Sequence, residues 1–304
     1  MPARQLLTTL HRALPAALAL LASLSAPQPA VAQVSVKDDL GHTITLAQPA
    51  RRVVSLAPHL TEDLFAIGAG PLLVGAVSYS DYPAEALKLP RVGGYNGFDL
   101  ERIRALKPDL IVAWETGNPA RQLAQVEALG IPLFRDNSRT LDDVPKALVR
   151  LGTLAGHEAD AAAAARRFGE HIARLESQYA ARPPVRVFYQ IWDRPLMTVN
   201  KQQIISDAMR VCGAVNVFAE LPTLTPTVDD EAVLVANPEL IATGGDGTNS
   251  AKSLDRWRRW PRLAAVRTGQ LAVLPPDLLV RMGPRLPLGV EHLCQAVDRA
   301  RQAR

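Results

Sequence analysis

The sequence predicts an α/β protein with two similar lobes, each built on a parallel central sheet, joined by one long helix, with a ligand cleft between the lobes. Short apolar segments alternate with helical ones, as in parallel sheets covered by helices. The segment Glu158–Tyr179 consists almost entirely of strong helix formers. The segments on either side of it resemble each other. We therefore expect an N-terminal lobe over 33–156, a linker helix over 157–181 and a C-terminal lobe over 182–304.

Residues 1–32 have the features of an export signal. A positively charged start is followed by an apolar run rich in Ala and Leu, and Ala30-Val31-Ala32 fits the small-residue cleavage pattern. The apolar run is too short for a stable membrane anchor. We expect cleavage near Gln33 and a soluble, exported protein.

The charge balance argues against a nucleic-acid partner. The chain has 34 Lys and Arg against 30 Asp and Glu. Two of those arginines lie in the expected signal, so the excess in the exported part is small and scattered. The one basic and aromatic cluster, Arg256 to Trp260, is explained as a helix end whose long side chains cover apolar surface.

The two cysteines, Cys212 and Cys294, both lie in the part expected to be exported. An oxidising compartment favours one disulfide between them. The alternative is two separate buried thiols. A catalytic thiol is not expected in either case.

The first half alternates strands and helices after an N-terminal hairpin. The turn signal at Asp39 to Gly41 separates the two hairpin strands, and Gly130 ends one of the helices. In order, we expect strands at 34–36, 43–46, 52–56, 73–77, 110–114 and 131–134, and helices at 61–67, 100–106, 121–129 and 141–151.

The second half repeats this plan after the Pro183-Pro184 break. We expect strands at 185–189, 240–242 and 271–274, and helices at 204–210, 231–236, 255–260 and 288–301. At an offset of 130 residues, Asp99 corresponds to Asp229, Glu101 to Glu231 and Pro108 to Pro238, which indicates a duplicated lobe. Ligands of such proteins bind near the carboxyl ends of the strands.

Aromatic residues gather in the loops that follow the predicted strands. They make up only 5% of the chain. Aromatic side chains on loops favour a broad apolar ligand face. The alternative is that most of them pack at the edges of the lobes. The residues concerned are Tyr79, Tyr82, Tyr95, Trp114 and Trp192.

Enzyme motifs and metal-ligand spacings are absent from the sequence. No HExxH, GxSxG or phosphate-binding loop occurs, and no histidine has a second His or Cys at metal-ligand spacing. We expect no enzymatic activity, no cofactor and no resident metal. His59 follows a strand near the predicted cleft, where it either approaches a metal carried by the ligand or bonds to nearby backbone. An exported α/β hydrolase is the alternative from another functional class.

Several motifs resemble those of the periplasmic binding proteins of ABC importers for cobalamin, haem and ferric siderophores, and most closely the cobalamin-binding members. The resemblance covers nearly the whole exported part. The motifs that carry it are Arg52-Val53-Val54-Ser55-Leu56-Ala57-Pro58 with Thr61-Glu62, Ser78-Tyr79-Ser80-Asp81-Tyr82-Pro83, Leu100-Glu101-Arg102-Ile103, Leu106 to Leu110, Ala113-Trp114, Gly117-Asn118, Val211-Cys212-Gly213, Asn216-Val217-Phe218 and Leu293-Cys294.

This resemblance implies partners and some of the site residues. Cys212 and Cys294 match the family's disulfide pair. Glu101 and Glu231 match its two surface glutamates, one per lobe, which dock onto arginines of the membrane permease. The alternative role of each Glu is an acid favoured at a helix N-terminus. Recurrence in both lobes favours docking, because a two-fold permease offers one anchor to each lobe.

The ligand site matches the family in part. Tyr79 and Trp114 match aromatic residues that contact the corrin ring, and Tyr95 stands where cobalamin-binding members have Trp. Asp277 and Arg281 match a loop of the second lobe, where Leu278 and Leu279 replace aromatic residues. Met197 replaces a Phe, and Trp192 completes the expected ligand set.

The sequence therefore predicts a periplasmic, monomeric binding protein that captures cobalamin and delivers it to an ABC permease. Haem, held by Tyr79, Tyr82 or His59, or a ferric siderophore is the alternative ligand. Because a continuous helix resists sharp bending, we expect a largely pre-formed cleft and small lobe motions. Gly169 is the single interior glycine of that helix.

Overall fold

The computed structural model describes residues 33–244 and 248–304, without the side chains of residues 248–250. The expected export signal, residues 1–32, lies outside the described residues. Among the described residues, no helix combines the length and the apolar character that crossing a membrane requires.

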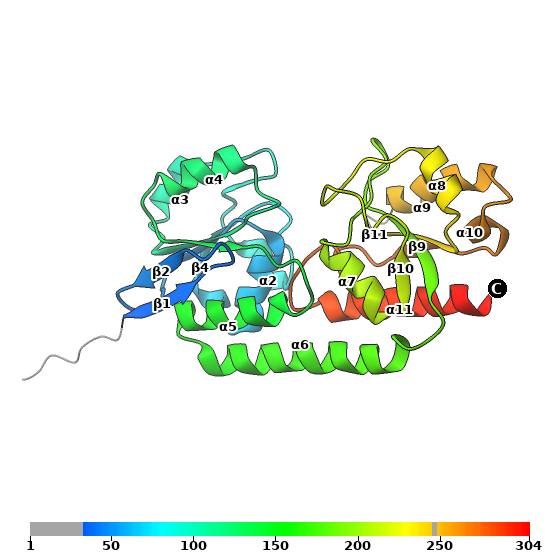
Figure 1. The fold of residues 1–304 in the computed structure, drawn as a ribbon. Helices are drawn as coiled ribbons and strands as arrows, with labels where there is room; N and C mark the ends of the chain where they lie inside the picture. The colour runs from blue at the N-terminus through cyan, green and yellow to red at the C-terminus, as the bar shows by residue number, and fades with distance from the viewer. Residues whose placement is uncertain (1–32, 245–247) are drawn as a thin grey trace, which may run out of the picture. The chain divides into compact units, whose positions relative to one another are not determined.

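Two four-stranded parallel sheets with the same strand order form the centres of the two lobes (Figure 1). The first sheet has the order β4-β3-β7-β8 and the second the order β10-β9-β11-β12. In both, the second strand along the chain lies outside the first and the third lies on the other side. The strands are β3 (Val53–Ser55), β4 (Leu73–Ala76), β7 (Leu110–Trp114), β8 (Leu133–Asp136), β9 (Val185–Gln190), β10 (Ala214–Asn216), β11 (Leu240–Gly244) and β12 (Leu271–Leu274).

Helices cover both faces of each sheet, and two small hairpins complete the described chain. The α-helices are α2 (Pro58–Ala66), α3 (Leu100–Ala105), α4 (Ala120–Glu127), α5 (Asp143–Ala155), α6 (Glu158–Tyr179), α7 (Ile204–Val211), α8 (Asp230–Ala236), α9 (Thr248–Asp255), α10 (Ala264–Arg267) and α11 (Leu286–Gln302). The hairpins pair β1 (Val34–Lys37) with β2 (Thr43–Leu46) and β5 (Gly93–Gly94) with β6 (Gly97–Phe98). Three 3₁₀ turns are η1 (Gly70–Leu72), η2 (Ala84–Lys88) and η3 (Arg256–Arg259).

Most expected elements are present, with three corrections. Helix α2 begins at Pro58 and not at Thr61, because proline fits the first helical position, where its missing N–H costs nothing. The expected helix at 255–260 is the 3₁₀ turn η3, preceded by α9. Strand β10 and the β5–β6 hairpin were not predicted, since all three strands are short, β10 follows a glycine, and three of the four hairpin residues are glycines.

Helix α6 has the predicted bounds and connects the two lobes. Phe168, Ile172, Leu175 and Tyr179 are buried along one stripe, as the spacing predicted. The stripe packs against α5 in the first lobe and against α7 and α11 in the second (Figure 1). The helix continues through Gly169, where a Cβ would point into open space and meet no other part of the chain within 4 Å beyond the helix's own backbone.

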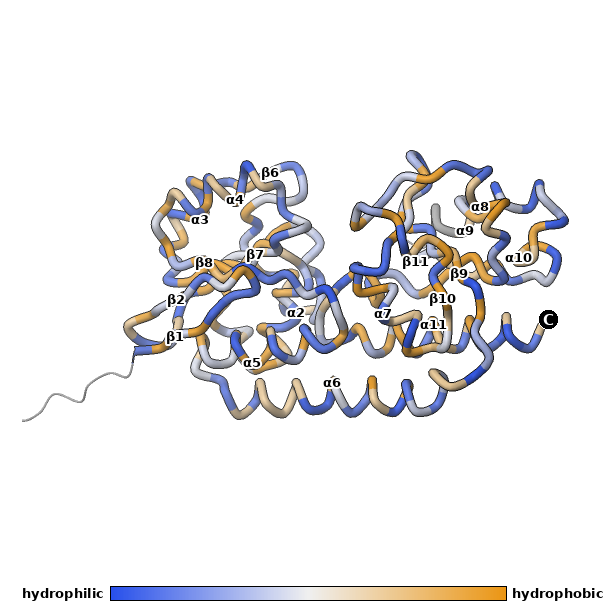
Figure 2. Tube along the Cα trace, viewed as in Figure 1, coloured by the Kyte–Doolittle hydropathy of each residue, from blue (hydrophilic) through white to orange (hydrophobic). Residues whose placement is uncertain are grey.

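One hydrophobic core extends through both lobes on the side of the sheets that faces α6. It includes Val53 and Leu148 of the first lobe together with Val187 and Leu293 of the second. Two smaller cores lie on the opposite faces, one under α3 and α4 and one around the buried Trp257. Figure 2 shows apolar residues concentrated along the central strands. Because the lobes share a core, moving them apart exposes apolar surface to water.

The two lobes repeat the same helix cap in front of the equivalent strands β7 and β11. The Asp99 carboxylate accepts a hydrogen bond from the Arg102 N–H at 2.9 Å, and the Asp229 carboxylate accepts one from the Ala232 N–H at 2.7 Å. Each aspartate therefore satisfies one free N–H group at the start of its helix, α3 or α8. This equivalence supports the 130-residue offset found in the sequence.

The carboxyl ends of α3 and α8 are also stabilised in the same way. Arg52 donates from Nη2 to the Leu106 carbonyl at 2.6 Å, and Arg186 donates from Nη2 to the Ala236 carbonyl at 2.7 Å. Arg52 directly precedes β3, and Arg186 is the second residue of β9, so both lie at the start of the first strand of their central sheet. A guanidinium at this end satisfies free carbonyls and complements the helix dipole.

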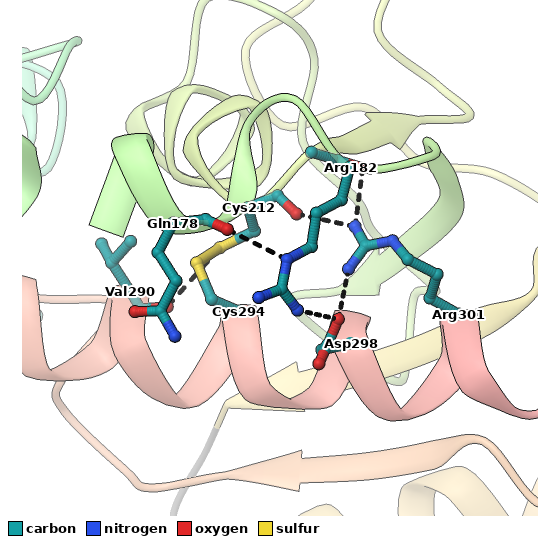
Figure 3. The surroundings of a disulfide bond; sticks show 8 residues. Gln178, Arg182, Cys212, Val290, Cys294, Asp298 and Arg301 are labelled. Carbon is teal, nitrogen blue, oxygen red and sulfur yellow. Dashed lines mark hydrogen bonds and ion pairs between the residues drawn. A yellow bond between two sulfur atoms is a disulfide. The ribbon is translucent and has the colours of Figure 1, made fainter. Parts of the chain in front are cut away.

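A disulfide between Cys212 and Cys294 connects the end of α7 to α11 (Figure 3). It confirms the predicted pairing and spans 82 residues of sequence. Close by, the Asp298 carboxylate accepts hydrogen bonds from Arg182 at 2.6 Å and from Arg301 at 2.7 Å. The hydrogen bond from Arg182 lowers the pKa of Asp298. These contacts join the chain that leaves α6 to α11.

Helix α2 carries a buried carboxyl group, Asp63, at the contact between the lobes. The Asp63 side chain is almost fully buried, and the backbone at Gly283 of the second lobe passes against it. Burial raises the pKa of Asp63 well above its ordinary value, and the nearby charges of Asp136 and Glu62 raise it further. The Asp63 carboxyl is therefore favoured in its neutral form.

We expect removal of the disulfide to lower the free energy of unfolding by about 2–5 kcal/mol, because it frees a long loop in the unfolded chain. Urea denaturation of Cys212→Ala/Cys294→Ala, followed by circular dichroism, measures the loss. Reduction of the unmodified protein should cause a similar loss, and the double variant should not respond to reductant. An unchanged urea midpoint in the double variant would contradict the expectation.

We expect Asp63→Asn to increase stability relative to the unmodified protein at pH 8 and to have less effect at pH 4. The unfolded chain releases the Asp63 proton near the ordinary pKa of 3.8, whereas the folded protein keeps it to higher pH. The free energy of unfolding of the unmodified protein therefore falls as the pH rises from 3.8 towards the pKa of Asp63 in the folded protein. Denaturant unfolding across this range tests the difference, with Glu158→Gln as a surface control. A pH-independent difference for Asp63→Asn would show that Asp63 does not titrate in this way.

Candidate functional site

The seven predicted ligand residues lie in the loops at or after strands, and four of them mark the carboxyl ends of sheet strands. Tyr79 follows β4, Trp114 is the last residue of β7, Trp192 follows β9, and Asp277 follows β12. Because the strands within each sheet are parallel, their carboxyl ends lie at one edge of that sheet. We call these loops the strand-end loops.

Three of the aromatic side chains are unusually exposed. Tyr79 is 68% exposed, Tyr95 is 76% exposed and Trp192 is 63% exposed. Large aromatic side chains in a folded protein ordinarily bury most of their surface. Their exposure at the strand-end loops leaves apolar area available for a ligand.

The loop that carries Tyr79 is held rigidly by hydrogen bonds. The Ser78 N–H donates to the Gly93 carbonyl at 2.8 Å, which joins this loop to the hairpin that carries Tyr95. The Arg91 guanidinium donates to the Ser80 carbonyl at 2.9 Å. On the other side, the Ser80 hydroxyl lies 3.1 Å from the hydroxyl of Thr61 in α2. These contacts explain why the motifs around Thr61 and Tyr79 occur together.

The Tyr95 hairpin is fixed in turn to the start of α4. The Gln122 side chain accepts a hydrogen bond from the Phe98 N–H at 2.7 Å and donates to the Asn96 carbonyl at 3.2 Å. Gln122 lies in α4, the helix that follows the Trp114 loop. The loops carrying Tyr79, Tyr95 and Trp114 therefore form one hydrogen-bonded unit.

Trp114 is packed more tightly than the other predicted aromatic contacts. Its ring lies edge-on to His59 at 5.3 Å between centroids. Gly117 also lies against the ring, because an added Cβ there would come within 1.8 Å of the indole. The Asn118 side chain accepts a hydrogen bond from the backbone N–H of Trp114 at 2.8 Å. Trp114 thus supports the loop and is only partly exposed.

In the second lobe, Trp192 and Met197 face each other across a short ribbon. They form an antiparallel bridge, and Met197 forms a second bridge with Thr227. The indole N–H of Trp192 donates to the Arg194 carbonyl at 3.0 Å. The ribbon places Trp192 outward, whereas Met197 is partly buried beside it.

Asp277 and Arg281 come together with residues of the first lobe. The Arg281 guanidinium lies 3.1 Å from the Asp277 carboxylate, and its Nη1 donates to Asp81 at 2.7 Å and to Glu62 at 2.9 Å. Burial alone would lower the pKa of Arg281, but the hydrogen bonds to Asp81 and Glu62 outweigh it and raise that pKa. The Arg281 guanidinium is therefore already paired with carboxylates of the protein itself.

Arg285 forms the second connection between the lobes. It donates from Nε to the Glu62 carboxylate at 2.7 Å and from Nη2 at 2.6 Å, a bidentate pair. Its guanidinium lies over the Tyr82 ring at 3.9 Å from the centroid. The hydrogen bond to Glu62 raises the pKa of Arg285.

Glu62, Asp81 and Arg285 were not among the predicted ligand residues. Glu62 was expected near the start of a helix and as part of a family motif, without a role in the site, and its side chain is 1% exposed. A buried carboxylate needs a cationic partner, but the two arginines follow it by 219 and 223 residues. For Asp81 and Arg285, the one available signal was their position inside the expected strand-end loops. Glu62 had no such signal.

His59 lies in α2 and not on a loop. It is 2% exposed, and its Nε2 lies 3.3 Å from the Asp136 carboxylate. This paired and buried position does not point the ring to a ligand. Among the described residues, no group of three His, Cys, Asp or Glu side chains is placed to hold a metal ion.

Glu101 and Glu231 occupy equivalent positions in the first turns of α3 and α8. Both side chains are exposed, and neither takes part in an ion pair within the described parts of the chain. A hollow of about 920 Å³ borders Glu231 and is lined by charged residues such as Asp193, Asp230 and Arg256 together with apolar ones such as Leu196 and Val228. Arg256 donates to Asp193 at 2.8 Å and to Asp230 at 2.5 Å, so it joins the Trp192 ribbon to α8.

Comparison with known proteins gives consistent results. The sequence profile described as periplasmic binding protein matches residues 53–278. The chain is 38% identical to a vitamin B12-binding protein of Vibrio cholerae serotype O1 over 247 residues, which are 81% of this chain and 88% of that protein. A vitamin B12-binding protein of Pectobacterium carotovorum is 40% identical over 80% of this chain and 87% of its own length.

Solved structures share the fold. The crystal structure of the periplasmic vitamin B12-binding protein BtuF of Vibrio cholerae superposes with a TM-score of 0.78 at 37% identity, over 84% of this chain and 99% of that one. The periplasmic heme-binding protein RhuT from Roseiflexus sp. RS-1 has a TM-score of 0.72 at 24% identity, over 83% and 99%. The latter likeness concerns the fold alone. By sequence and by fold, this chain belongs to the periplasmic binding protein family.

Proposed function

We propose that this protein captures cobalamin in the periplasm and delivers it to the permease of an ABC importer. The observation that carries the proposal is the exposure of Tyr79, Tyr95 and Trp192 on rigid strand-end loops. Such aromatic faces suit a large planar ligand such as a corrin ring. The similarity to vitamin B12-binding proteins supports cobalamin as that ligand.

The arrangement favours binding over catalysis. The strand-end loops offer aromatic faces and hydrogen-bonding groups, and their cations and carboxylates are largely paired with each other. A nucleophile with a base in hydrogen-bonding reach was not expected from the sequence, and the relatives are named as binding proteins. The ligand would be held by shape, apolar contact and a few hydrogen bonds.

Haem is the second candidate ligand. A periplasmic heme-binding protein of Pseudomonas aeruginosa has a TM-score of 0.72 at 25% identity over 82% of this chain and 92% of its own. The exposed phenol of Tyr79 is a group that can bind haem iron. His59 is a weaker candidate because of its burial.

We expect calorimetric titration of the purified protein to show saturable binding of cyanocobalamin, and little or none of haemin or a ferric siderophore. Trp192→Ala should weaken cobalamin binding by about tenfold, since one aromatic contact contributes roughly 1–1.5 kcal/mol. The surface variant Leu87→Ala, an exposed residue of the η2 turn, serves as the control. Tight haemin binding without saturable cobalamin binding would reject the first candidate in favour of the second.

We further propose that Glu101 and Glu231 dock onto cationic groups of the permease, one in each lobe. Their equivalent positions, exposure and lack of ion pairs in the described chain support this role. Both helices are held at each end, by Asp99 and Arg52 or by Asp229 and Arg186. A fixed acid on each lobe suits a two-fold partner.

We expect Glu101→Arg/Glu231→Arg to abolish cobalamin uptake into vesicles that contain the importer, because attraction becomes repulsion at both contacts. Cobalamin affinity of the free protein should change by less than about twofold, since the substitutions lie outside the strand-end loops. Glu158→Arg/Glu170→Arg on α6 changes the net charge equally and should preserve uptake. Normal uptake by the Glu101→Arg/Glu231→Arg protein would rule out these anchors.

A further inference from the structure

Arg281, the arginine of the predicted ligand set, is already paired with carboxylates of the protein. Arg281 is surrounded by the carboxylates of Glu62, Asp81 and Asp277, at 2.9, 2.7 and 3.1 Å. Its side chain is only 9% exposed. An arginine that binds a ligand carboxylate usually presents its planar edge for a bidentate contact. Here the protein's own carboxylates occupy that edge.

Arg285 is saturated in the same way. Two of its hydrogen bonds go to Glu62, and the flat face of the guanidinium covers Tyr82. The Arg285 side chain is 21% exposed. The two arginines therefore stabilise the contact between the lobes and do not create a positive site for a ligand.

The five charged residues of this cluster leave a surplus of negative charge. Two arginines face three carboxylates, so the net charge is −1 if all are ionised. Glu62 is 1% exposed, whereas Asp81 is 45% and Asp277 is 42% exposed. The surplus therefore lies on the solvent side, at Asp81 and Asp277.

Asp81 keeps its charge at neutral pH. Partial burial acts to raise the pKa of Asp81, but the hydrogen bond and charge of Arg281 outweigh it and lower that pKa. Both aspartates follow strands of the central sheets, Asp81 after β4 and Asp277 after β12. Their free oxygens are acceptors that suit N–H donors.

We propose that Asp81 and Asp277 select the ligand by charge, accepting hydrogen bonds from neutral amide groups and repelling carboxylates. This inference rests on the proposed function, since it places the ligand at the strand-end loops. Cobalamin carries peripheral amides, whereas haem carries two carboxylates. A ligand carboxylate brought near these aspartates meets like charge, and both arginines of the cluster are already paired with the protein's own carboxylates. The cluster would thus favour cobalamin over haem, the two kinds of tetrapyrrole that binding proteins of this fold take.

The test compares cyanocobalamin with its monocarboxylic acids, in which one peripheral amide is hydrolysed. These ligands match in size and shape and differ by one charge. At pH 7.5, we expect at least one acid to bind the unmodified protein about tenfold more weakly than cyanocobalamin, as expected for like charges a few ångströms apart in a partly polar site. In Asp81→Asn/Asp277→Asn, the difference should shrink several-fold, and haemin binding should increase.

The control variant Glu158→Gln/Glu170→Gln removes two charges from α6 and should keep the full discrimination. Circular dichroism establishes folding of each variant, and Asp81→Asn alone replaces the double variant if the latter does not fold.

Equal affinities of the unmodified protein for cyanocobalamin and all its acids would overturn the inference. Unchanged discrimination in the Asn variant would overturn it as well. By contrast, the absence of saturable cyanocobalamin binding would reject the proposed function itself. Tight haemin binding alongside saturable cyanocobalamin binding would overturn the charge selection alone.

Discussion

The buried carboxylate of Glu62 is the interaction on which the arrangement of the two lobes depends. It lies in α2 of the first lobe and is paired with Arg281 and Arg285 of the second. An ion pair buried this deeply costs desolvation of every partner, and loss of one partner leaves an unpaired charge worth about 3–5 kcal/mol. The loop that contains Asp277 therefore takes its position from a helix of the opposite lobe, and the lobes cannot separate without breaking this pairing.

The shared core and α6 act in the same direction as Glu62. Apolar residues of both lobes pack continuously against the stripe from Ala161 to Tyr179. A domain hinge usually requires a flexible crossing segment and a small interface. Here the crossing segment is a continuous helix, and both the hydrophobic core and the ion pairs extend across the boundary. These features account for the expected small motions.

Local features of the sequence predicted much of the fold, and long-range features did not. The bounds of α6 followed from helix propensity and from the spacing of Phe168, Ile172 and Leu175, which act within a few turns. The strand-end loops could be found because they follow apolar strands. The role of Glu62 could not, because its partners are more than 200 residues away. Trp114 was identified as a contact residue, but packing against Gly117 and His59 takes up much of its ring.

The stiffness of α6 also bears on how tightly two weak contacts can act together. Glu101 and Glu231 lie on separate lobes whose spacing this helix fixes. When two anchors belong to one rigid body, formation of the first contact brings the second to a high effective concentration, and little conformational entropy is lost on completing it. In the proposed docking, each glutamate would bind weakly enough to release after delivery, while the pair together would hold the loaded protein in place. The same helix would penalise a partner whose two anchor points have a different spacing.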